Sequence, residues 1–320
     1  MMADIPSKPS VLILASRFDF TCDYVVAALR RRGTQYLRLN SEDLPICAVA
    51  LDPISRRLHV QLNDTNFLLA PDSLRSVLFR RPVFLRDYGD DNHTAQECFG
   101  QIQWAAFMRN LVLFHEARWY NDPAHTYRAE HKALQLYEAS RIGLRVPATV
   151  VTNSPQFQTM PSRDDRIAVK GLDTVLVREG GDEIFGFTTF ANFDELNPAA
   201  WASAPGILQQ PIENKTDIRV TVVEDQVYTA EILVHGKGIR DDWRTHKGDA
   251  QFAPHDLNPQ VTQQCIELVK VLGLRFGAID LALSEGAYYF LEINPTGEWA
   301  WLVDAAGLSI DEGMADALAR

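Results

Sequence analysis

The chain has 320 residues, 31 of them basic and 42 acidic, so its formal net charge is −11. Hydrophobic residues make up 46% and charged residues 23%, with four cysteines, a composition that excludes wholesale disorder, collagen-like repeats and a disulfide scaffold. No stretch approaches the roughly 18 consecutive apolar residues of a membrane span, and no signal peptide is evident. The acidic balance argues against nucleic-acid binding, and the widely spaced cysteines favour the cytoplasm.

The first 120 residues predict an α/β unit. Short apolar runs typical of buried strands cover 11–15, 35–39 and 76–80. A looser alternation over 58–69 predicts a hairpin. Helical spacing covers 23–32, where a glycine at position 33 ends it, and 96–114. In the second helix the apolar residues expected near one face are Phe99, Ile102, Phe107 and Leu111.

The remaining sequence predicts an α+β body rich in antiparallel hairpins. Asp122 and Pro123 form an N-cap pair for one helix over 124–142, and further helices are expected over 259–272 and 310–318. Strands are expected over 166–170, 174–178, 183–190, 207–212, 217–223, 226–234, 276–283 and 287–294. We divide the chain at these pattern changes into 1–120, 121–206 and 207–320.

The stretch 276–297 carries the most informative pattern. Asp280 and Glu292 each stand inside an apolar run, and the turn between the runs brings them opposite one another or one pair apart. Asn294 follows Glu292 at the two-residue strand period and shares its face. Because buried carboxylates are costly and Mg²⁺ prefers oxygen ligands, the three predict a Mg²⁺ site. The alternative is that Asp280 pairs with an arginine and Glu292 only ends a strand.

Two lysines and two strands supply further candidate residues that could contact a nucleotide. Lys170 ends an apolar strand and Lys132 lies on the helix that opens the middle region, so either could hold phosphate oxygens, although most such lysines are solvated. The strand 207–212 could present backbone groups to a purine. Asp217 and Arg219 share one strand face, where they suit a ribose and a phosphate, or else form a surface ion pair. The P-loop and Rossmann fingerprints are missing.

These features, in this order, resemble the ATP-grasp superfamily. Within it the chain resembles the graspetide (microviridin-type) peptide macrocyclases and, in its catalytic body, the ribosomal-protein-modifying glutamate ligases. The resemblance implies an α/β pre-ATP-grasp domain, then an α+β ATP-grasp body whose two antiparallel-sheet lobes enclose ATP. The segments that carry the closer match are FRRP at 79–82, WYNDP at 119–123, HKALQL at 131–136, GLRVPAT at 143–149, DWR at 242–244 and EINPTGEW at 292–299.

The resemblance also implies a role for each candidate residue. ATP contacts, those to adenine mostly through backbone groups, are implied for Lys132, Lys170, Gln209, Gln210, Ile212 and Asp217. Catalytic roles on the phosphate charge are implied for Lys170 and Arg219, and Mg²⁺ binding for Asp280, Glu292 and Asn294. Candidates for holding acidic substrate groups, with structural ion pairs as the alternative, are Arg80, Arg81, Arg240 and Arg244. The hairpin around 180–181 would form a lid over ATP.

The implied enzyme is an ADP-forming ligase. It would use ATP and Mg²⁺ to activate a side-chain carboxylate as an acylphosphate and then form ester or amide crosslinks within a ribosomal precursor peptide that has a leader segment and an acidic core. The resemblance suggests a homodimer. The alternative is a stand-alone ligase that joins an amino acid or small amine to a carboxylate metabolite or protein. A nucleotide-binding module without activity is the third reading, and paired carboxylates argue against it.

Overall fold

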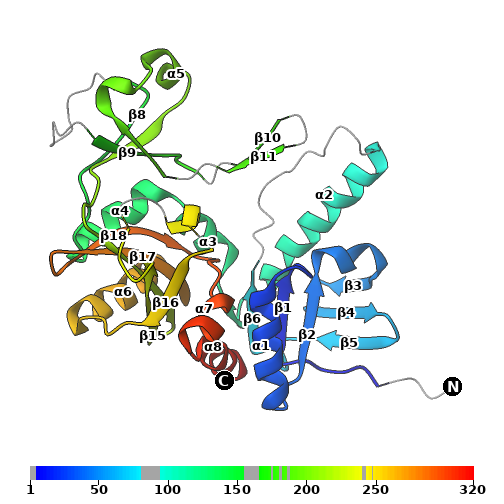
Figure 1. The fold of residues 1–320 in the computed structure, drawn as a ribbon. Helices are drawn as coiled ribbons and strands as arrows, with labels where there is room; N and C mark the ends of the chain where they lie inside the picture. Colours follow the sequence, from blue (N-terminus) through cyan, green and yellow to red (C-terminus); the bar gives the residue numbers. More distant parts are fainter. Residues whose placement is uncertain are drawn as a thin grey trace.

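The structure is a computed structural model of the chain. It describes residues 5–80, 94–154, 166–173, 176–179, 182–185, 188–239, 243–246 and 248–320. Over these residues the strands form five sheets, and Figure 1 shows the chain running from an N-terminal sheet on the right to two antiparallel sheets on the left.

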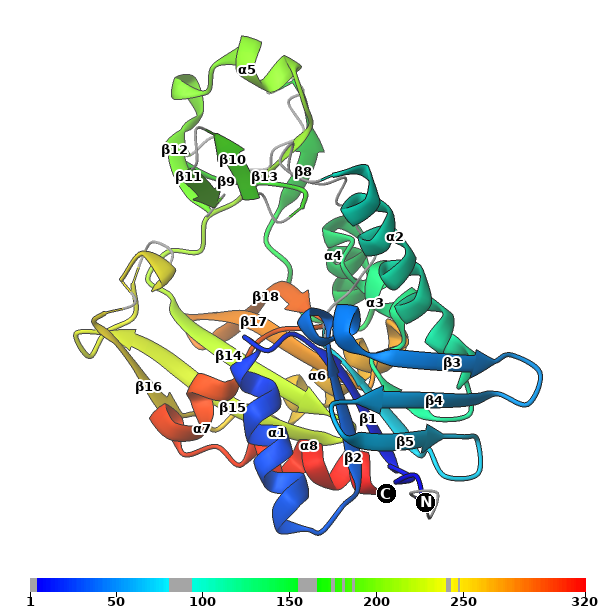
Figure 2. The ribbon, with the colours of Figure 1, turned by 90° about the vertical axis from the view of Figure 1, so that its right-hand side faces the viewer.

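The N-terminal sheet is parallel, in the order β2-β1-β6-β7. Its strands are β1 (Val11–Ala15), β2 (Tyr36–Asn40), β6 (Ser76–Phe79) and β7 (Arg118–Tyr120). Every residue of β1 is buried, as expected of a strand covered on both faces. One face packs against the helices α1 (Phe20–Arg31) and α8 (Ile310–Ala319), so the first helix and the last helix of the chain lie side by side (Figure 2).

A small antiparallel sheet covers the other face of the parallel sheet. It consists of β3 (Ala48–Asp52), β4 (Arg57–Leu62) and β5 (Thr65–Leu69), preceded by the 3₁₀ helix η1 (Ser41–Ile46). The predicted hairpin at 58–69 is therefore confirmed as β4 and β5, with β3 as a third strand that the sequence did not indicate.

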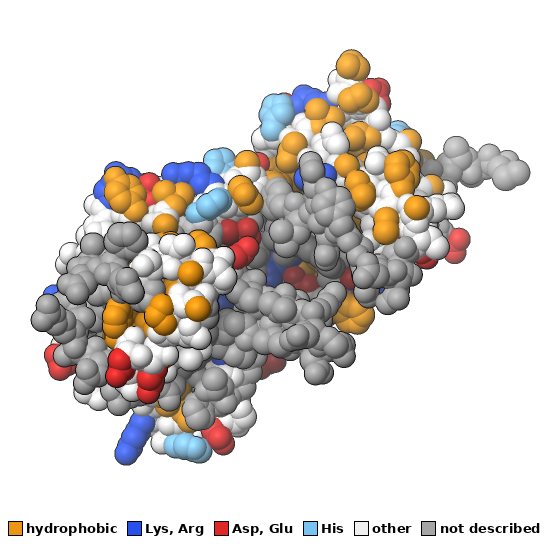
Figure 3. All heavy atoms as spheres, turned by 90° about the horizontal axis from the view of Figure 1, so that it is seen from above, with side chains coloured by type: hydrophobic (Ala, Val, Ile, Leu, Met, Phe, Trp, Pro, Cys, Tyr) orange, Lys and Arg blue, Asp and Glu red, His pale blue; other side chains and the backbone are white. Residues whose placement is uncertain are grey.

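The helix predicted over 96–114 differs from the observed one. Helix α2 (Ala95–Asn110) ends four residues earlier and continues as the single 3₁₀ turn η2 (Leu111–Leu113). Phe99 and Ile102 are 63% and 39% exposed, because only the C-terminal end of α2 reaches the core. Seen from above, hydrophobic side chains gather toward the right, the side on which α2 lies in Figure 1 (Figure 3).

The single helix predicted over 124–142 is two helices. Asp122 caps α3 (Pro123–Ala129) as expected, but the backbone of His131 is extended, and α4 (Lys132–Arg141) begins after it. The Gln135 side chain donates to the Ala129 carbonyl at 2.6 Å, which satisfies one of the groups left by the break. The break places Lys132 at the first position of α4.

A four-stranded antiparallel sheet follows, in the order β12-β9-β13-β8. Its strands are β8 (Thr149–Thr152), β9 (Arg166–Lys170), β12 (Thr189–Asn192) and β13 (Gly206–Gln209), with η3 (Phe193–Glu195) and α5 (Pro198–Ala202) between the last two. The predicted hairpin exists as β10 (Leu176–Glu179) and β11 (Asp182–Phe185), and its glycines at 180–181 lie outside the described residues. Strand β13 ends before Gln210 rather than at 212, since Pro211 has no N–H to donate.

The last sheet is antiparallel and five-stranded, in the order β16-β15-β14-β17-β18. Its strands are β14 (Thr216–Val223), β15 (Gln226–Val234), β16 (Ala250–Pro254), β17 (Phe276–Ser284) and β18 (Ala287–Asn294). The helices α4 and α6 (Pro259–Val271) cover one face of it. Two further elements complete the chain, the turn η4 (Trp243–His246) and the helix α7 (Ala300–Ala306).

The predicted succession of an α/β opening and an α+β body is confirmed. Strands β7, β8 and β16 and helices α5 and α7 are additions that the sequence did not indicate. The division at residues 120 and 206 stays a prediction. In the described part of the chain no helix is long and apolar enough to cross a membrane, and all four cysteines are free thiols.

Candidate active site

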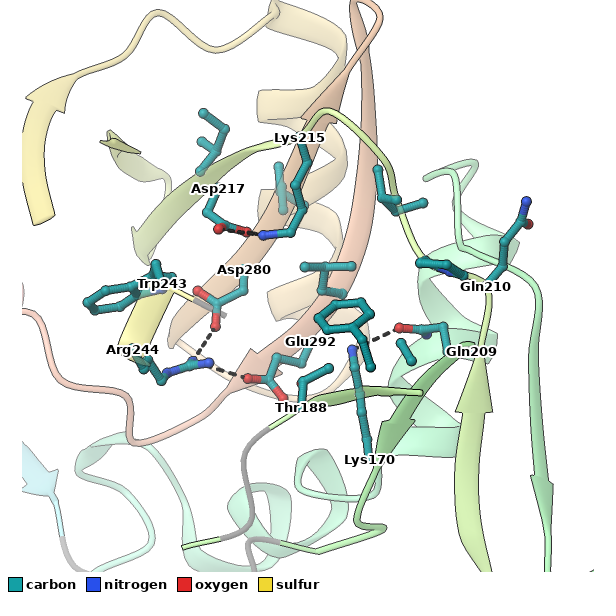
Figure 4. A pocket seen from close by; sticks show the side chains of 17 residues that line it. Lys170, Thr188, Gln209, Gln210, Lys215, Asp217, Trp243, Arg244, Asp280 and Glu292 are labelled. Atoms are coloured by element: carbon teal, nitrogen blue, oxygen red, sulfur yellow. Dashed lines mark hydrogen bonds and ion pairs between the residues drawn. The ribbon is translucent and has the colours of Figure 1, made fainter. Parts of the chain in front are cut away.

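A cleft lies between the four-stranded and the five-stranded antiparallel sheets. Charged side chains from both sheets line it: Lys170, Lys215, Asp217, Arg244, Asp280 and Glu292 (Figure 4). Between them lie apolar groups suited to a flat ring: Ala168, Phe190, Pro211, Ile212, Trp243, Leu281 and Leu291.

The paired carboxylates meet as the sequence predicts. Asp280 on β17 lies directly opposite Glu292 on β18, and the register shifts immediately after Asp280. Both residues line the cleft. Asn294 follows on β18 but does not line the cleft, and its Oδ1 accepts from the Thr296 backbone N–H at 3.0 Å. The structure therefore brings two of the three predicted metal ligands together.

Two arginines face these carboxylates. The Arg219 guanidinium donates to Asp280 Oδ1 at 2.7 Å, and Arg244 donates to Asp280 Oδ2 at 3.2 Å. Arg244 also lies 3.5 Å from Glu292 Oε1. Burial alone would raise the pKa of Asp280, but the charges of Arg219 and Arg244 outweigh it, and the pKa lies below its ordinary value. Asp280 is therefore an anion at neutral pH, as a metal ligand must be.

The two lysines come from different elements. Lys170, at the end of β9, donates from Nζ to Gln209 Oε1 at 2.8 Å inside the cleft. Lys132, at the start of α4, donates to the carbonyl of Gly171, the residue after Lys170, at 3.1 Å. The helix break and the strand end thus bring Lys132 to the backbone beside Lys170, although Lys132 does not line the cleft itself.

The segment after β13 presents backbone groups. The Gln210 backbone N–H donates to the Ala148 carbonyl at 2.8 Å, which fixes this connection between the sheets. In the described part of the chain, the Gln210 carbonyl and the Ile212 N–H take part in no backbone hydrogen bond. The Gln210 side chain points away from the other labelled residues in Figure 4. Backbone contacts from this segment are the ones its geometry allows.

Lys215 is a site residue that the sequence reasoning missed. Its Nζ contacts both carboxylate oxygens of Asp217 at 2.6 Å, and both side chains are largely buried in the cleft wall. The signal was present, because Lys215, the residue just before β14, precedes Asp217 and Arg219 at the two-residue period of that strand. Trp243 is a second missed residue, and its ring packs edge-on against Phe252.

Two buried amides hold the strands that carry the carboxylates. The Asn121 side chain accepts from the backbone N–H of Phe276, at the start of β17, at 3.0 Å and donates to the carbonyl of Pro295, just after β18, at 2.8 Å. Gln135 on α4 donates to the Ile293 carbonyl and accepts from the Ile293 N–H, at 2.8 Å and 3.1 Å. These bonds fix the backbone just after Glu292 and the start of β17, the strand that carries Asp280.

The four predicted substrate arginines differ in their surroundings. Arg244 lines the cleft. Arg80 is buried and donates to Asp19 at 3.0 Å and to the Gly297 carbonyl at 3.1 Å. Its bond to Asp19 is a structural ion pair, which the sequence analysis gave as the alternative to substrate binding. Arg81 and Arg240 lie outside the described residues.

Comparison with known proteins agrees with this geometry. Residues 194–318 match the family described as RimK-like ATP-grasp domain. A RiPP-associated ATP-grasp ligase from Chryseobacterium gregarium, solved with ADP and a leader and core peptide, shares 25% sequence identity, with a TM-score of 0.82 over 98% of this chain and 96% of that one. The chain is an ATP-grasp ligase.

Two macrocyclases from Microcystis aeruginosa MRC are also similar to the ligase. MdnC, solved with precursor peptide MdnA, shares 26% identity at a TM-score of 0.80, covering 96% of this chain and 98% of that one. MdnB shares 25% identity at a TM-score of 0.75, and the match covers 98% of this chain and 99% of MdnB. Among curated protein sequences, none matches the ligase significantly. The similarity therefore extends over the whole ligase, beyond residues 194–318.

Proposed function

We propose that this ligase uses ATP and Mg²⁺ to crosslink side chains of a ribosomal precursor peptide through ester or amide bonds. The observation that carries the proposal is the end-to-end similarity, over 98% of this chain, to a ligase solved with ADP and a leader and core peptide. The cleft supports it, because Lys170 and Lys215 face the paired carboxylates Asp280 and Glu292 across one cleft lined by apolar groups.

ATP would lie across the cleft. Its adenine ring would lie against the apolar groups beside the backbone of Gln210 and Ile212, with Gln209 shaping the wall. Asp217, held by Lys215, can accept from ribose hydroxyls. Lys170 and, from the adjacent backbone, Lys132 are the cations for the phosphate oxygens.

The carboxylate pair fits a Mg²⁺ ion by its chemistry. Asp280 and Glu292 supply anionic oxygens from adjacent strands, and Asn294 adds an amide oxygen at the strand end. The chemistry that Mg²⁺ supplies there is neutralisation of the charge that develops on the phosphates.

The reaction needs positioning more than a protein nucleophile. A peptide carboxylate oxygen attacks the γ-phosphorus of ATP, and ADP leaves, which gives an acylphosphate. A peptide hydroxyl or amine then attacks the acyl carbon, and phosphate leaves with one carboxylate oxygen. Arg219, which donates to Asp280 and to the Glu298 carbonyl, would stabilise phosphate charge.

The peptide itself would be recognised by charge. Arg244 is the described arginine that reaches the cleft, and a carboxylate of an acidic core is its natural partner. We also propose that the ligase acts as a homodimer in the cytoplasm, where its four free thiols suit a reducing compartment.

Intact-mass spectrometry tests the proposal. The ligase is incubated with Mg²⁺–ATP and the candidate precursor peptide encoded beside its gene, with Asp280→Asn as the inactive control. Each crosslink should remove about 18 mass units, one water, from the peptide, in step with ADP formation. ADP formed without this loss would instead support a stand-alone ligase with a different acceptor.

A further inference from the structure

Arg80 joins the N-terminal sheet to the loop that follows β18. It comes directly after β6, its side chain is 4% exposed, and its backbone N–H donates to the Leu14 carbonyl at 2.9 Å. Its Nε donates to Asp19 at 3.0 Å, and its Nη1 donates to the Gly297 carbonyl at 3.1 Å. Asp19 is itself the N-cap of α1. The loop is therefore tied, through Arg80, to the N-terminal part of the chain.

The next carbonyl of this loop is bound from the other side, by Arg219. The Glu298 carbonyl accepts from Arg219 Nη2 at 3.0 Å, while Nη1 of the same guanidinium donates to Asp280 at 2.7 Å. Gly297 and Glu298 are consecutive, so the two accepting carbonyls belong to adjacent peptide units. A continuous series of contacts therefore runs from Arg80 through this loop and Arg219 to the Asp280 carboxylate.

The packing around Gly297 couples the loop to Arg219. A β-carbon placed on Gly297 would lie 3.1 Å from Arg219 Nη2 and 2.4 Å from the β-carbon of Ala278 on β17. Groups packed this closely have no void between them that could absorb a displacement. A shift of the Gly297 carbonyl therefore also moves the guanidinium of Arg219.

The buried charge of Arg80 favours a positioning role over a merely stabilising one. Removing a guanidinium from water is costly, and apolar side chains of similar volume can join two parts of a protein as firmly. The rigid fork of an arginine can instead donate to a carboxylate and to a carbonyl in fixed directions. Resting on the proposed function, we propose that Arg80 is a positioning residue that sets the orientation of Arg219 toward the phosphates through the loop 297–298.

This role predicts an effect on the rate of reaction rather than on ATP binding. Contacts to adenine, ribose and phosphates are proposed for Gln210, Asp217 and Lys170, which belong to the segment after β13, to β14 and to β9. Arg80 acts instead on the loop after β18. Because charge on the phosphates develops in the transition state, a misplaced Arg219 lowers kcat more than it raises the KM for ATP.

A spectroscopic measurement tests the positioning step without turnover. The Nε–H resonance of Arg219, assigned by its loss in Arg219→Lys, is followed by NMR of ¹⁵N-labelled protein in the wild type, Arg80→Gln and Arg80→Lys. Arg32→Gln is the matched control, because Arg32 also donates to a carboxylate, that of Asp316, and to a carbonyl, that of Glu312, but both lie on α8. Far-UV circular dichroism establishes that each variant is folded.

The Arg219 resonance should shift in Arg80→Gln and stay unchanged in Arg32→Gln. In Arg80→Lys the shift should be smaller, because the amine keeps the charge without the fork. If Arg80→Gln does not fold, Arg80→Lys against Arg32→Gln decides the question. A resonance that is unchanged in the folded Arg80 variants, or that shifts equally in Arg32→Gln, overturns the positioning role.

A double-mutant cycle tests the effect on catalysis. The kcat and the KM for ATP are measured from ADP formation with the precursor peptide in the wild type, Arg80→Gln, Arg219→Lys and the double variant. Arg80→Gln should lower kcat about tenfold and change the KM for ATP less than about twofold. In the Arg219→Lys background the same substitution should have little further effect, because the two residues act as one unit. Arg32→Gln should keep kcat within about twofold of the wild type.

Two outcomes of the cycle have different meanings. Fully additive losses in the double variant would show that Arg80 acts independently of Arg219, which overturns the positioning role. A wild type that forms no ADP with the precursor peptide overturns the proposed function, while the Arg219 resonance still decides the positioning step.

Discussion

Asp280 is the residue on which the site most depends. Two arginines hold its side chain, which is 17% exposed, opposite Glu292, so removal of its charge affects the metal and both arginines together. Asp280→Asn should lower ADP formation at least about 100-fold, since the developing phosphate charge loses its main support. A coupled assay for ADP with the precursor peptide measures the loss.

Asp225→Asn is the control for that substitution. Asp225 lies in the turn between β14 and β15 of the same sheet, and its ion pair with Lys270 is well exposed. Its removal should leave ADP formation within about twofold of the wild type, because exposed pairs contribute little. Full activity in Asp280→Asn would refute the metal assignment of this residue.

Glu42 gives a pH dependence of stability. Burial alone would raise its pKa, but bonds from the Ser16 hydroxyl and the Arg17 backbone N–H lower it from 4.5 to about 2. A lowered pKa stabilises the fold fully above 4.5, and this stabilisation is lost as the pH falls toward 2. Glu42→Gln should therefore flatten the fall in the free energy of unfolding over this window.

Urea unfolding at about pH 5, 4 and 3 gives the free energy of unfolding at each pH, and its slope against pH is compared between the wild type and Glu42→Gln. Glu195→Gln provides the comparison: the pKa of Glu195 is also lowered, by bonds from Asn192, but it lies on an exposed turn. Its slope should change less than that of Glu42→Gln, because Glu195 is exposed to solvent. Parallel curves for the wild type and Glu42→Gln would show that these two bonds do not contribute.

Site residues whose position is set by local strand geometry could be predicted from the sequence, and those placed by distant packing could not. Asp280 opposite Glu292 was predictable, because strand period and turn length fix register locally. Lys215 was equally readable from the period of β14. The pairing of Asp280 with arginines was open, and the position of Arg244 was not predictable, because η4 is a turn whose placement depends on distant packing.

At the scale of elements, Gln135 joins α4 to β18. Its amide makes three hydrogen bonds, to the Ala129 carbonyl and to both backbone groups of Ile293, and its side chain is buried. Gln135→Leu leaves these groups unpaired and should lower the free energy of unfolding by about 3 kcal/mol. Urea denaturation followed by circular dichroism measures the change.

Gln101→Leu on α2 is the matched control, since this glutamine is exposed and the exchange is the same. Its effect should stay within about 0.5 kcal/mol. A loss in Gln135→Leu no larger than in Gln101→Leu would show that α4 is held to β18 by apolar packing alone.

Elements with a strong local pattern were predictable, and those set by tertiary packing were not. The strands β14, β15, β17 and β18 carry sustained apolar runs and turn residues and appear close to their expected bounds. The break between α3 and α4 has no proline or glycine to signal it. The end of β13 before Pro211 follows from the missing N–H and was readable from the sequence.

At the scale of the whole molecule, one core joins the two ends of the chain. The buried set that contains Val11 and Ile13 of β1 also contains Ile310, Met314 and Leu318 of α8. Polar contacts reinforce it: the Ser76 hydroxyl donates to the Leu318 carbonyl at 2.6 Å, Tyr120 donates to the Ala317 carbonyl at 3.1 Å, and Arg32, the C-cap of α1, pairs with Asp316. The N-terminal sheet is thus completed by the C-terminal helix.

A fragment of residues 1–120 should therefore not fold by itself, even though the sequence divides there. Without α8, apolar side chains of α1 and β1 that are buried in the full chain face water, at about 25 cal/mol per Å² exposed. We expect the fragment to unfold in urea without a cooperative transition, while the full chain shows one. Circular dichroism of both at matched concentration measures this. A sigmoidal transition in the fragment would mean that the parallel sheet is stable with one face of α1 uncovered, and that the contact with α8 serves to orient the ATP-grasp body.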